Sequence, residues 1–382
     1  MTIEDWRAKI NVLDDELLRL FNERARLALQ VGASKTASGL SLCDHTREAE
    51  VIESMCEQNE GPLDERAVVE LFRAVIHESR RIQQRASEES REPHKTLAFK
   101  QQGNVFDVAF QGAPGAFSEE AAVKLLGEDI NLVPRPTFES LFNAIEDQSA
   151  NYLLVPIENS LVGFVHACFD LLRESKLSIV GEVIIPISHC LIGCPGATFP
   201  LITSVESHSV ALDQCRRFLS ANPQIKRIAA DDTAGSVAKV VAEGDVSRAA
   251  IAGRRAADQY GGVILREHLE DSSENYTRFL LLTAESAFPD DADKMSIVIE
   301  LPHQPGALHK ALEPFASRGI DLLRLEGRPV KGRPWEYCFY LDLRGSPRDA
   351  EVVEALNELR VQRVETRLLG AYRSAQIPSQ AS

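Results

Sequence analysis

The sequence lacks the features that direct a protein to a membrane or to nucleic acid. Its first six residues, MTIEDW, lack a basic segment followed by an apolar one, and no apolar run approaches the 18 or so residues of a membrane span. Positive charge is scarce, because 42 Lys and Arg face 57 Asp and Glu, for a formal net charge of −15. We therefore expect a cytoplasmic protein that binds neither nucleic acid nor anionic membranes, although the local field can still favour a small anionic substrate.

Cysteine pairs are also missing. There are seven cysteines, an odd number, and only Cys190 and Cys194 lie close together, with no second pair to complete a zinc site. The histidines do not pair with Cys or Asp at ligand spacing. We expect reduced, mostly buried thiols, no metal and no cofactor. There is no low-complexity tract and no repeat at a solenoid period.

The composition is that of a soluble globular protein, with 44% hydrophobic and 26% charged residues, and 382 residues suggest two or three domains. The sequence pattern changes along the chain, and these changes mark domain boundaries. We expect an all-helical domain over 1–90, a polar, proline-interrupted linker over 91–104, an α/β domain over 105–285 and an α+β domain over 294–372.

The first segment has helical periodicity. Residues 3–35 contain no proline, and their apolar residues recur close to every 3.5 positions, which predicts one long helix suited to coiled packing. A second helix follows Asp44, a good N-cap, and a third spans about 63–85 behind Pro62.

Four polar residues break the apolar stripes of these helices. Arg24 and Lys35 share a face of the first helix, about 16 Å apart along its axis. Ser79 and Gln83 stand where the third helix should be apolar. Each is individually compatible with a solvated surface, but together they indicate a polar pocket inside a bundle that holds a small anion.

This segment resembles the all-helical type of chorismate mutase over nearly its full length. The resemblance implies an intramolecular rearrangement that needs no nucleophile, metal or redox cofactor. Arginines would clamp the substrate carboxylates, Lys35 and Gln83 would face the breaking ether oxygen, and Glu48 would hold the substrate hydroxyl. The positions that match the family's site are Arg7, Arg24, Lys35, Asp44, Arg47, Glu48, Ser79 and Gln83.

The spacing of two arginines predicts an assembly. Arg7 and Arg24 are about 25 Å apart on a straight helix, so one chain cannot bring both to one small ligand. If Arg7 is functional, it comes from a second subunit. We therefore expect a homodimer with entwined helices, and the family resemblance implies the same arrangement.

The middle of the chain alternates short strands with helices, and polar residues follow several of the strands. We expect the strand Tyr152–Val155 to end at Pro156, and a helix over Val165–Leu172. Such polar turns at the carboxyl ends of strands can form a ligand site, or they can simply cap helices. The glycine-rich run 111–118 is neither a Walker motif nor a dinucleotide fingerprint.

The order of strands, helices and polar turns from 105 to 285 is similar to prephenate dehydratase, most specifically in the stretches 156–160 and 277–279. The resemblance implies two α/β lobes, like type II periplasmic binding proteins, with the active site between them. It also implies concerted loss of CO2 and the ring hydroxyl from prephenate, assisted by Thr277 as a positioned donor. Arg278 would bind a carboxylate or support the turn. The further pocket candidates are Ser118, Glu158, Asn159, Ser160, His208, Gln214, Thr233, Ser236 and Phe279.

The last segment reads β-α-β-β-α-β, a ferredoxin-like pattern with almost no reactive side chains. It resembles an ACT domain, which implies regulation by L-phenylalanine and pairing of two such domains. Gly327 departs from the family, which more often has serine there, so one hydrogen bond to the effector is in doubt. The matching effector positions are Gly306, Ala307, Leu308, Glu326 and Arg328.

The leading hypothesis is thus a bifunctional enzyme under phenylalanine control. One alternative is a dehydratase, for prephenate or arogenate, whose mutase domain is inactive and serves only to dimerise. Another, from a different class, is a non-catalytic amino-acid sensor. The sequence indicates neither whether prephenate is channelled between the sites nor any assembly beyond a dimer.

Overall fold

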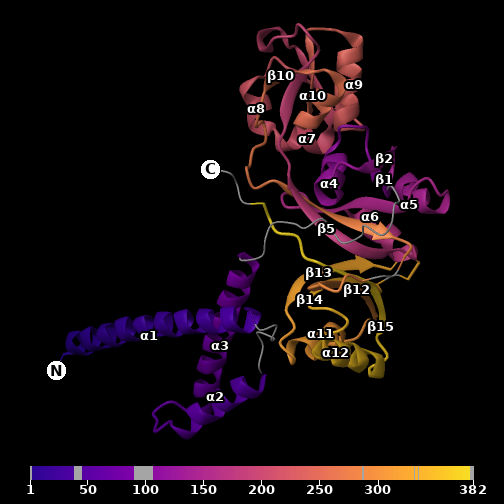
Figure 1. Cartoon of the computed structure of the whole chain (residues 1–382). Coiled ribbons are helices and arrows are strands. Elements are labelled where there is room, and N and C mark those ends of the chain that lie inside the picture. Colours follow the sequence, from indigo (N-terminus) through magenta and orange to yellow (C-terminus); the bar gives the residue numbers. More distant parts are fainter. Residues whose placement is uncertain are drawn as a thin grey trace. The chain divides into compact units, whose positions relative to one another are not determined.

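The computed structural model describes residues 2–37, 45–89, 106–285, 288–330, 332–333 and 335–378. They belong to two compact units, Met1–Lys95 and Thr96–Ser382, which are described separately (Figure 1). The predicted linker 91–104 lies outside the described residues. Of the described helices, none is long and apolar enough to cross a membrane.

The first unit is all-helical, as predicted. Thr2 and Asp64 cap its first and third helices with side-chain oxygens that accept backbone N–H groups. The first and second helices both pack on the third, where Val68 and Ile76 are buried. The helices are α1 (Ile3–Ala37), α2 (His45–Glu57) and α3 (Glu65–Glu89).

The first lobe of the second unit is formed around the strands at one end of a large mixed sheet. The strand order of the whole sheet is β13-β14-β12-β15-β5-β11-β3-β1-β2, with a short β4 beside β3. The lobe's elements are β1 (Phe106–Gln111), α4 (Phe117–Leu126), β2 (Ile130–Arg135), α5 (Phe138–Glu146), β3 (Tyr152–Asn159), β4 (Gly163–Phe164), α6 (His166–Glu174), β5 (Ser178–Pro186) and β11 (Tyr276–Thr283).

The second lobe has its own five-stranded sheet, with strand order β10-β6-β9-β7-β8. Its parallel strands β7, β8 and β9 are connected by helices, as the predicted alternation of strands and helices implies. The elements are β6 (Cys190–Gly193), the 3-10 turn η1 (Phe199–Leu201), β7 (Ser204–His208), α7 (Ser209–Gln214), α8 (Arg216–Ala221), β8 (Lys226–Ala230), α9 (Thr233–Glu243), β9 (Arg248–Ala252), α10 (Arg254–Tyr260) and β10 (Val263–Arg266).

The C-terminal domain has the predicted β-α-β-β-α-β order, and its strands join the sheet of the first lobe. The junction is a parallel contact of Gly370 in β15 with Ile179 in β5. Only glycine fits there, because an added Cβ would lie 2.1 Å from the Ile179 carbonyl oxygen. The elements are β12 (Lys294–Leu301), α11 (Ala307–Ala316), β13 (Leu322–Pro329), β14 (Tyr337–Arg344), α12 (Ala350–Val361) and β15 (Glu365–Tyr372).

One predicted strand end is wrong. β3 does not stop before Pro156 but continues to Asn159, paired with β11. The physical reason is that its other neighbour, β1, pairs only as far as Leu154. On the side of β1 there is no pairing at Pro156, so the missing N–H group of proline costs no hydrogen bond there. The extra residues carry Asn159 to the start of β11.

Candidate functional sites

Asn159 and Thr277 lie opposite each other at the junction of β3 and β11. They are partners in the strand register, and Asn159 Nδ2 donates to Thr277 Oγ1 at 3.0 Å. The same nitrogen donates to Asn275 Oδ1 at 2.8 Å. Two residues that lie more than 100 positions apart in sequence thus form one polar cluster, as the resemblance implies.

The orientation of the Asn159 amide is fixed by its backbone surroundings. Its Oδ1 accepts hydrogen bonds from the N–H groups of Leu161 and Val162, both at 3.0 Å. Oxygen can only accept here, so Nδ2 must face Thr277. The Thr277 oxygen therefore acts as an acceptor in this contact, and its own hydrogen stays available to a further acceptor.

Ser160 has a structural contribution next to this pair. Its Oγ donates to the Glu274 carbonyl at 2.7 Å and accepts from the Tyr276 N–H at 2.9 Å. Both bonds hold the segment that precedes Thr277 against the end of β3. We infer that Ser160 fixes the approach of the two strands, which a substrate-binding role would not by itself require.

The second lobe contributes Gln214, at the end of α7. Its Nε2 lies 3.5 Å from Asn159 Oδ1, so it joins the cluster from the opposite lobe. Its Oε1 lies 2.8 Å from Nε2 of His189, a residue that the sequence analysis missed. His189 is only 2% exposed, and burial lowers the pKa of its imidazole, so the ring is held neutral.

Arg278 lies elsewhere than the predicted ligand position. Its guanidinium forms ion pairs with Glu182 and Asp342 and donates to the Tyr372 hydroxyl at 3.0 Å. The side chain is 6% exposed and faces the C-terminal domain. Successive residues of a strand point to opposite faces, so Arg278 turns away from the side that holds Thr277. In the described residues these groups of the chain itself bind the guanidinium, and a role of Arg278 in binding substrate stays a prediction.

Two other candidates are also engaged within the protein. Glu158, the strand partner of Arg278, forms an ion pair with Arg324 of β13. Phe279 is 2% exposed and belongs to the apolar core of the first lobe. Neither arrangement presents the side chain to a ligand beside Thr277.

The remaining candidates of this region make local contacts. Nδ1 of His208 accepts from the Val210 N–H at 3.3 Å and so caps α7. Oγ of Ser236 donates to the Asp232 carbonyl within α9, which starts at Thr233. Ser118 is buried in the first turn of α4. Within the described residues, these hydrogen bonds do not connect His208 or Ser236 to Thr277.

The glycine-rich run between β1 and α4 docks on the second lobe. The Ala113 N–H donates to the Asp232 carboxylate at 2.9 Å, and the Gly115 N–H donates to Glu119 at 2.8 Å. Gly115 has φ +84°, and an added Cβ would lie 2.8 Å from the Ala256 backbone. Two of the N–H groups that could bind an anion are thus occupied by the protein's own carboxylates.

In the helical unit, α1 and α3 bring predicted residues together. Nη1 of Arg24 donates to Oγ of Ser79 and, at 3.4 Å, to the Val75 carbonyl. Nε2 of Gln83 donates to the Ala28 carbonyl of α1 at 2.6 Å. Arg24, Ser79 and Gln83 therefore share the α1–α3 interface, which supports a polar pocket over a solvated edge.

The other predicted mutase residues are placed less fully. Arg7 is exposed near the start of α1. Arg47 is exposed in the first turn of α2 and forms an ion pair with Glu50 at 3.0 Å. Asp44 and the side chains of Lys35 and Glu48 lie outside the described residues.

Comparisons with known families match three successive segments of the chain. The model of chorismate mutase type II matches residues 6–84, that of prephenate dehydratase 108–287, and that of the ACT domain 295–361. The chain is 32% identical over 378 residues to a bifunctional chorismate mutase/prephenate dehydratase of Aquifex aeolicus, covering 98% of each chain. The chain belongs to the bifunctional chorismate mutase/prephenate dehydratase family.

Other relatives match about 70% of the chain. The chain is 41% identical over 281 residues to an arogenate dehydratase/prephenate dehydratase of Arabidopsis thaliana, covering 69% of this chain and 71% of that one. A prephenate dehydratase of Arthrobacter aurescens, solved with L-Phe, has a TM-score of 0.66 and 32% identity over 72% of this chain and 93% of its own. A solved quorum quenching acylase has a TM-score of 0.64 and 32% identity, covering 70% of this chain and 98% of its own.

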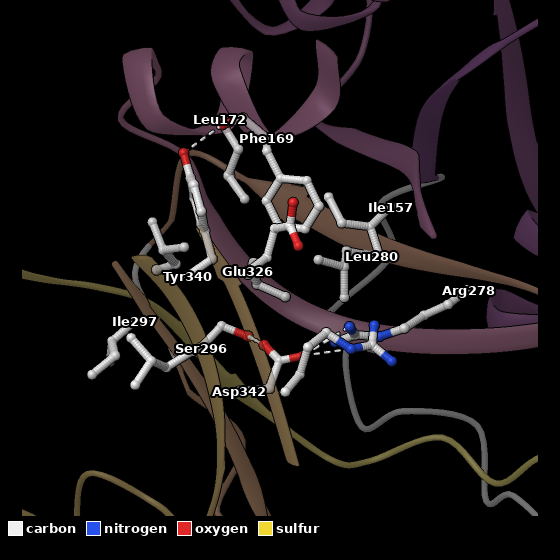
Figure 2. A pocket seen from close by; sticks show the side chains of 14 residues that line it. Ile157, Phe169, Leu172, Arg278, Leu280, Ser296, Ile297, Glu326, Tyr340 and Asp342 are labelled. Carbon is white, nitrogen blue, oxygen red and sulfur yellow. Dashed lines mark hydrogen bonds and ion pairs between the residues drawn. The ribbon is translucent and has the colours of Figure 1, made fainter. Parts of the chain in front are cut away.

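The cavity that Figure 2 draws lies where the ACT domain meets the dehydratase domain. The Phe169 and Tyr340 rings are 4.8 Å apart, and the Tyr340 hydroxyl donates to the Phe169 carbonyl at 2.9 Å. Glu326, a predicted effector residue, lines this cavity, and its carboxylate lies 3.3 Å from Nε2 of His166 in α6.

The other effector candidates lie in two places. Arg328 follows on β13 and forms an ion pair with Asp170 of α6 at 2.8 Å. Gly306 has a left-handed backbone with φ +77° ahead of α11, followed by Ala307 and Leu308 at the first turn. Glu326 and Arg328 thus both contact the dehydratase domain within this chain. Effector binding at these residues would therefore change contacts with that domain directly.

Proposed function

We propose that this chain rearranges chorismate to prephenate in its helical domain and converts prephenate to phenylpyruvate at the junction of its two lobes. The observation that carries the second activity is the oriented pair Asn159 and Thr277. An amide locked by backbone N–H groups makes the Thr277 oxygen an acceptor and leaves the hydroxyl hydrogen free to donate.

In the dehydratase step, the carboxylate on the ring leaves as CO2 and its bonding electrons enter the ring. The ring hydroxyl leaves with the electrons of its C–O bond and takes up one proton to become water. Aromatisation supplies the driving force, so the enzyme has to orient prephenate and stabilise the departing oxygen. We assign Thr277 the hydrogen bond to that oxygen, since a hydroxyl is too weak an acid to act without positioning.

In the mutase step, the bonds reorganise within one molecule, and binding the compact conformer of the dicarboxylate lowers the barrier. The α1–α3 interface supplies a guanidinium at Arg24 and an amide at Gln83. Arg24 would hold a carboxylate, and Gln83 with Lys35 would stabilise charge on the ether oxygen. Neither step needs a cofactor.

Incubating the purified protein with chorismate distinguishes this proposal from its rivals. Accumulation of phenylpyruvate is the expected result. A protein with an inactive mutase domain would convert only added prephenate, and an amino-acid sensor would convert neither substrate. Parallel assays with prephenate and arogenate decide which of the two the second site takes.

An acylase activity would need a nucleophile activated by a base. Ser188 does contact His268 Nδ1 at 3.1 Å and Glu270 Oε1 at 3.0 Å. Yet Glu270 approaches that same Nδ1, at 3.5 Å, whereas in a triad the acid and the nucleophile bind opposite ring nitrogens. The geometry therefore favours the dehydratase, and turnover of an N-acyl amide without turnover of prephenate would reverse that choice.

We further propose a homodimer through the mutase helices. Large apolar side chains of α1 stay exposed within the described residues, with Leu13 63% and Leu27 57% exposed. A second copy would cover this stripe in the manner of a coiled bundle. If Arg7 and Arg24 bind one ligand, their separation of about 25 Å along α1 calls for the same partner.

Mixing two inactive variants tests whether Arg7 acts across the dimer. Arg7→Ala and Arg24→Ala should each lose most mutase activity. Refolding or co-expressing them together should restore about a quarter of the wild-type activity, because half of the dimers are mixed and each mixed dimer has one intact site. No recovery from demonstrably mixed dimers would show that both arginines act within one chain.

We also propose feedback inhibition by L-phenylalanine through the ACT domain, supported by the L-Phe complex of the similar dehydratase. Gly327 replaces the serine that the family more often has. An added Cβ there would lie 3.2 Å from the Phe339 ring, a contact that a small ring shift relieves.

Gly327→Ser is expected to lower the phenylalanine concentration for half-inhibition several-fold, by restoring a hydroxyl that can bind the effector. Inhibition of dehydratase turnover is the measurement. Gly327→Ala is the matched control, since it adds the same Cβ without the hydroxyl. Equal inhibition of both variants would assign no role to the hydroxyl.

A further inference from the structure

His189 lies behind the dehydratase site and, within the described residues, its ring is connected to that site through Gln214. Its Nε2 lies 2.8 Å from Oε1 of Gln214, and the nearest reacting group that we assign, Thr277, lies two hydrogen bonds beyond Gln214. The ring is held from several sides. The His189 N–H donates to Glu270 at 2.7 Å, and the Phe117 ring meets the imidazole edge-on with centroids 5.6 Å apart.

The direction of this hydrogen bond is determined. Asn159 Oδ1 is an acceptor fixed by two backbone N–H groups, so Gln214 turns its NH2 group to that oxygen and its Oε1 to His189. A carbonyl oxygen can only accept, so Nε2 of His189 must carry the hydrogen. Because the imidazole is buried and neutral, Nδ1 then carries none, and it makes no hydrogen bond within the described part of the chain. Within the described residues, the buried ring thus donates its one hydrogen bond to Gln214.

That donor stabilises the orientation of the Gln214 amide in which its NH2 group faces Asn159. With Oε1 turned to His189, the NH2 group faces Oδ1 of Asn159, at 3.5 Å. The flipped amide would place its NH2 against the Nε2 hydrogen of His189 and its oxygen against the Asn159 oxygen. Both contacts would be repulsive with this tautomer, so His189 and Asn159 together disfavour the flipped state.

We propose that His189 is a positioning residue of the dehydratase, which holds the Gln214 amide so that a chain of hydrogen bonds runs from His189 through Gln214 and Asn159 to the Thr277 oxygen. Each member donates to the next, so the last acceptor is the Thr277 oxygen and its hydrogen is directed outward to the leaving group. This inference rests on the proposed role of Thr277 and deepens it. His189 itself does not touch the substrate.

The test compares His189→Leu, which removes the donor, with His189→Gln, which keeps an N–H near the position of Nε2. His189→Leu should lower kcat for prephenate about tenfold with little change in KM, since a lost orienting bond acts in the transition state. His189→Gln should recover most of that loss. Equal thermal unfolding midpoints for the two variants make the comparison one of orientation rather than folding.

A double-mutant cycle separates this inference from the role of Thr277. If His189 acts through Thr277, adding His189→Leu to Thr277→Ala should cause no further loss of kcat. A further tenfold loss, or unchanged kcat in His189→Leu alone, would overturn the positioning role while leaving the dehydratase assignment intact. Full activity of Thr277→Ala would instead refute the proposed function on which it rests.

Gln214→Glu offers a second, independent arm. Its carboxylate still accepts from His189 but cannot donate to Asn159, so the chain is interrupted in the middle. Its kcat should fall at least as far as that of His189→Leu, and His189→Leu should add nothing to it. Independent losses from the two changes would contradict the chain.

Discussion

Thr277→Ala is expected to lower the kcat of prephenate dehydration by about 10²- to 10³-fold, the usual effect of removing one preorganised donor from a developing negative oxygen. The effect should be on kcat, because the bond to the departing hydroxyl strengthens only as the C–O bond breaks. The fold should survive, since the Thr277 side chain bonds only to the amide of Asn159 among the contacts described.

Two further variants sharpen this prediction. Thr277→Ser keeps the hydroxyl and should retain most activity, whereas Thr277→Val keeps the shape and should be as impaired as the alanine variant. Mutase turnover of all three should match the wild type, because the helical domain is a separate compact unit. Dehydratase activity that is unchanged in a folded Thr277→Ala protein would remove Thr277 from the mechanism.

The sequence predicted the three architectures because each has its own periodicity. It placed Asn159 and Thr277 in one site only through a family resemblance, since nothing in the spacing of two distant residues makes them strand partners. The strand register does so, and it depends on β3 extending past Pro156. The structure of the sheet, rather than local propensity, decided that extension.

For Arg278, the alternation of side chains along a strand predicted the outcome better than the family motif did. Neighbouring strand residues face opposite sides, so Thr277 and Arg278 cannot both point to one ligand from a regular strand. The counter-charges of Arg278 come from β5 and β14. Glu182 and Asp342 are distant in sequence, and no pattern around Arg278 indicates them.

His189 could not be found by the same means. It is a single histidine in an apolar stretch, and most such residues are only satisfied core side chains. Its relevance follows from burial together with the contact to Gln214, which joins it to the site from the second lobe. The only prior signal was Gln214 itself, a polar residue at the end of a short helix.

Lys35→Ala is expected to raise the mutase barrier by about 3–4 kcal/mol, a loss of several hundredfold in kcat. Position 35 lies three residues past Gly32 on α1, and Gly32 is where an added Cβ would meet the Gln83 side chain at 3.0 Å. At the 3.6-residue period of an α-helix, positions 24, 28, 32 and 35 fall on one face. A cation at position 35 would act together with the Gln83 amide to stabilise charge on the ether oxygen.

The measurement is prephenate formation from chorismate, with dehydratase turnover of added prephenate as the internal reference. Arg19→Ala is the matched control, since Arg19 is a cation of the same helix whose ion pairs with Glu16 and Glu23 are solvent-exposed. It should leave both activities unchanged. If Lys35→Ala keeps near wild-type mutase turnover, charge stabilisation must come from Arg24 and Gln83 alone, and the mutase site is smaller than the family's pattern implies.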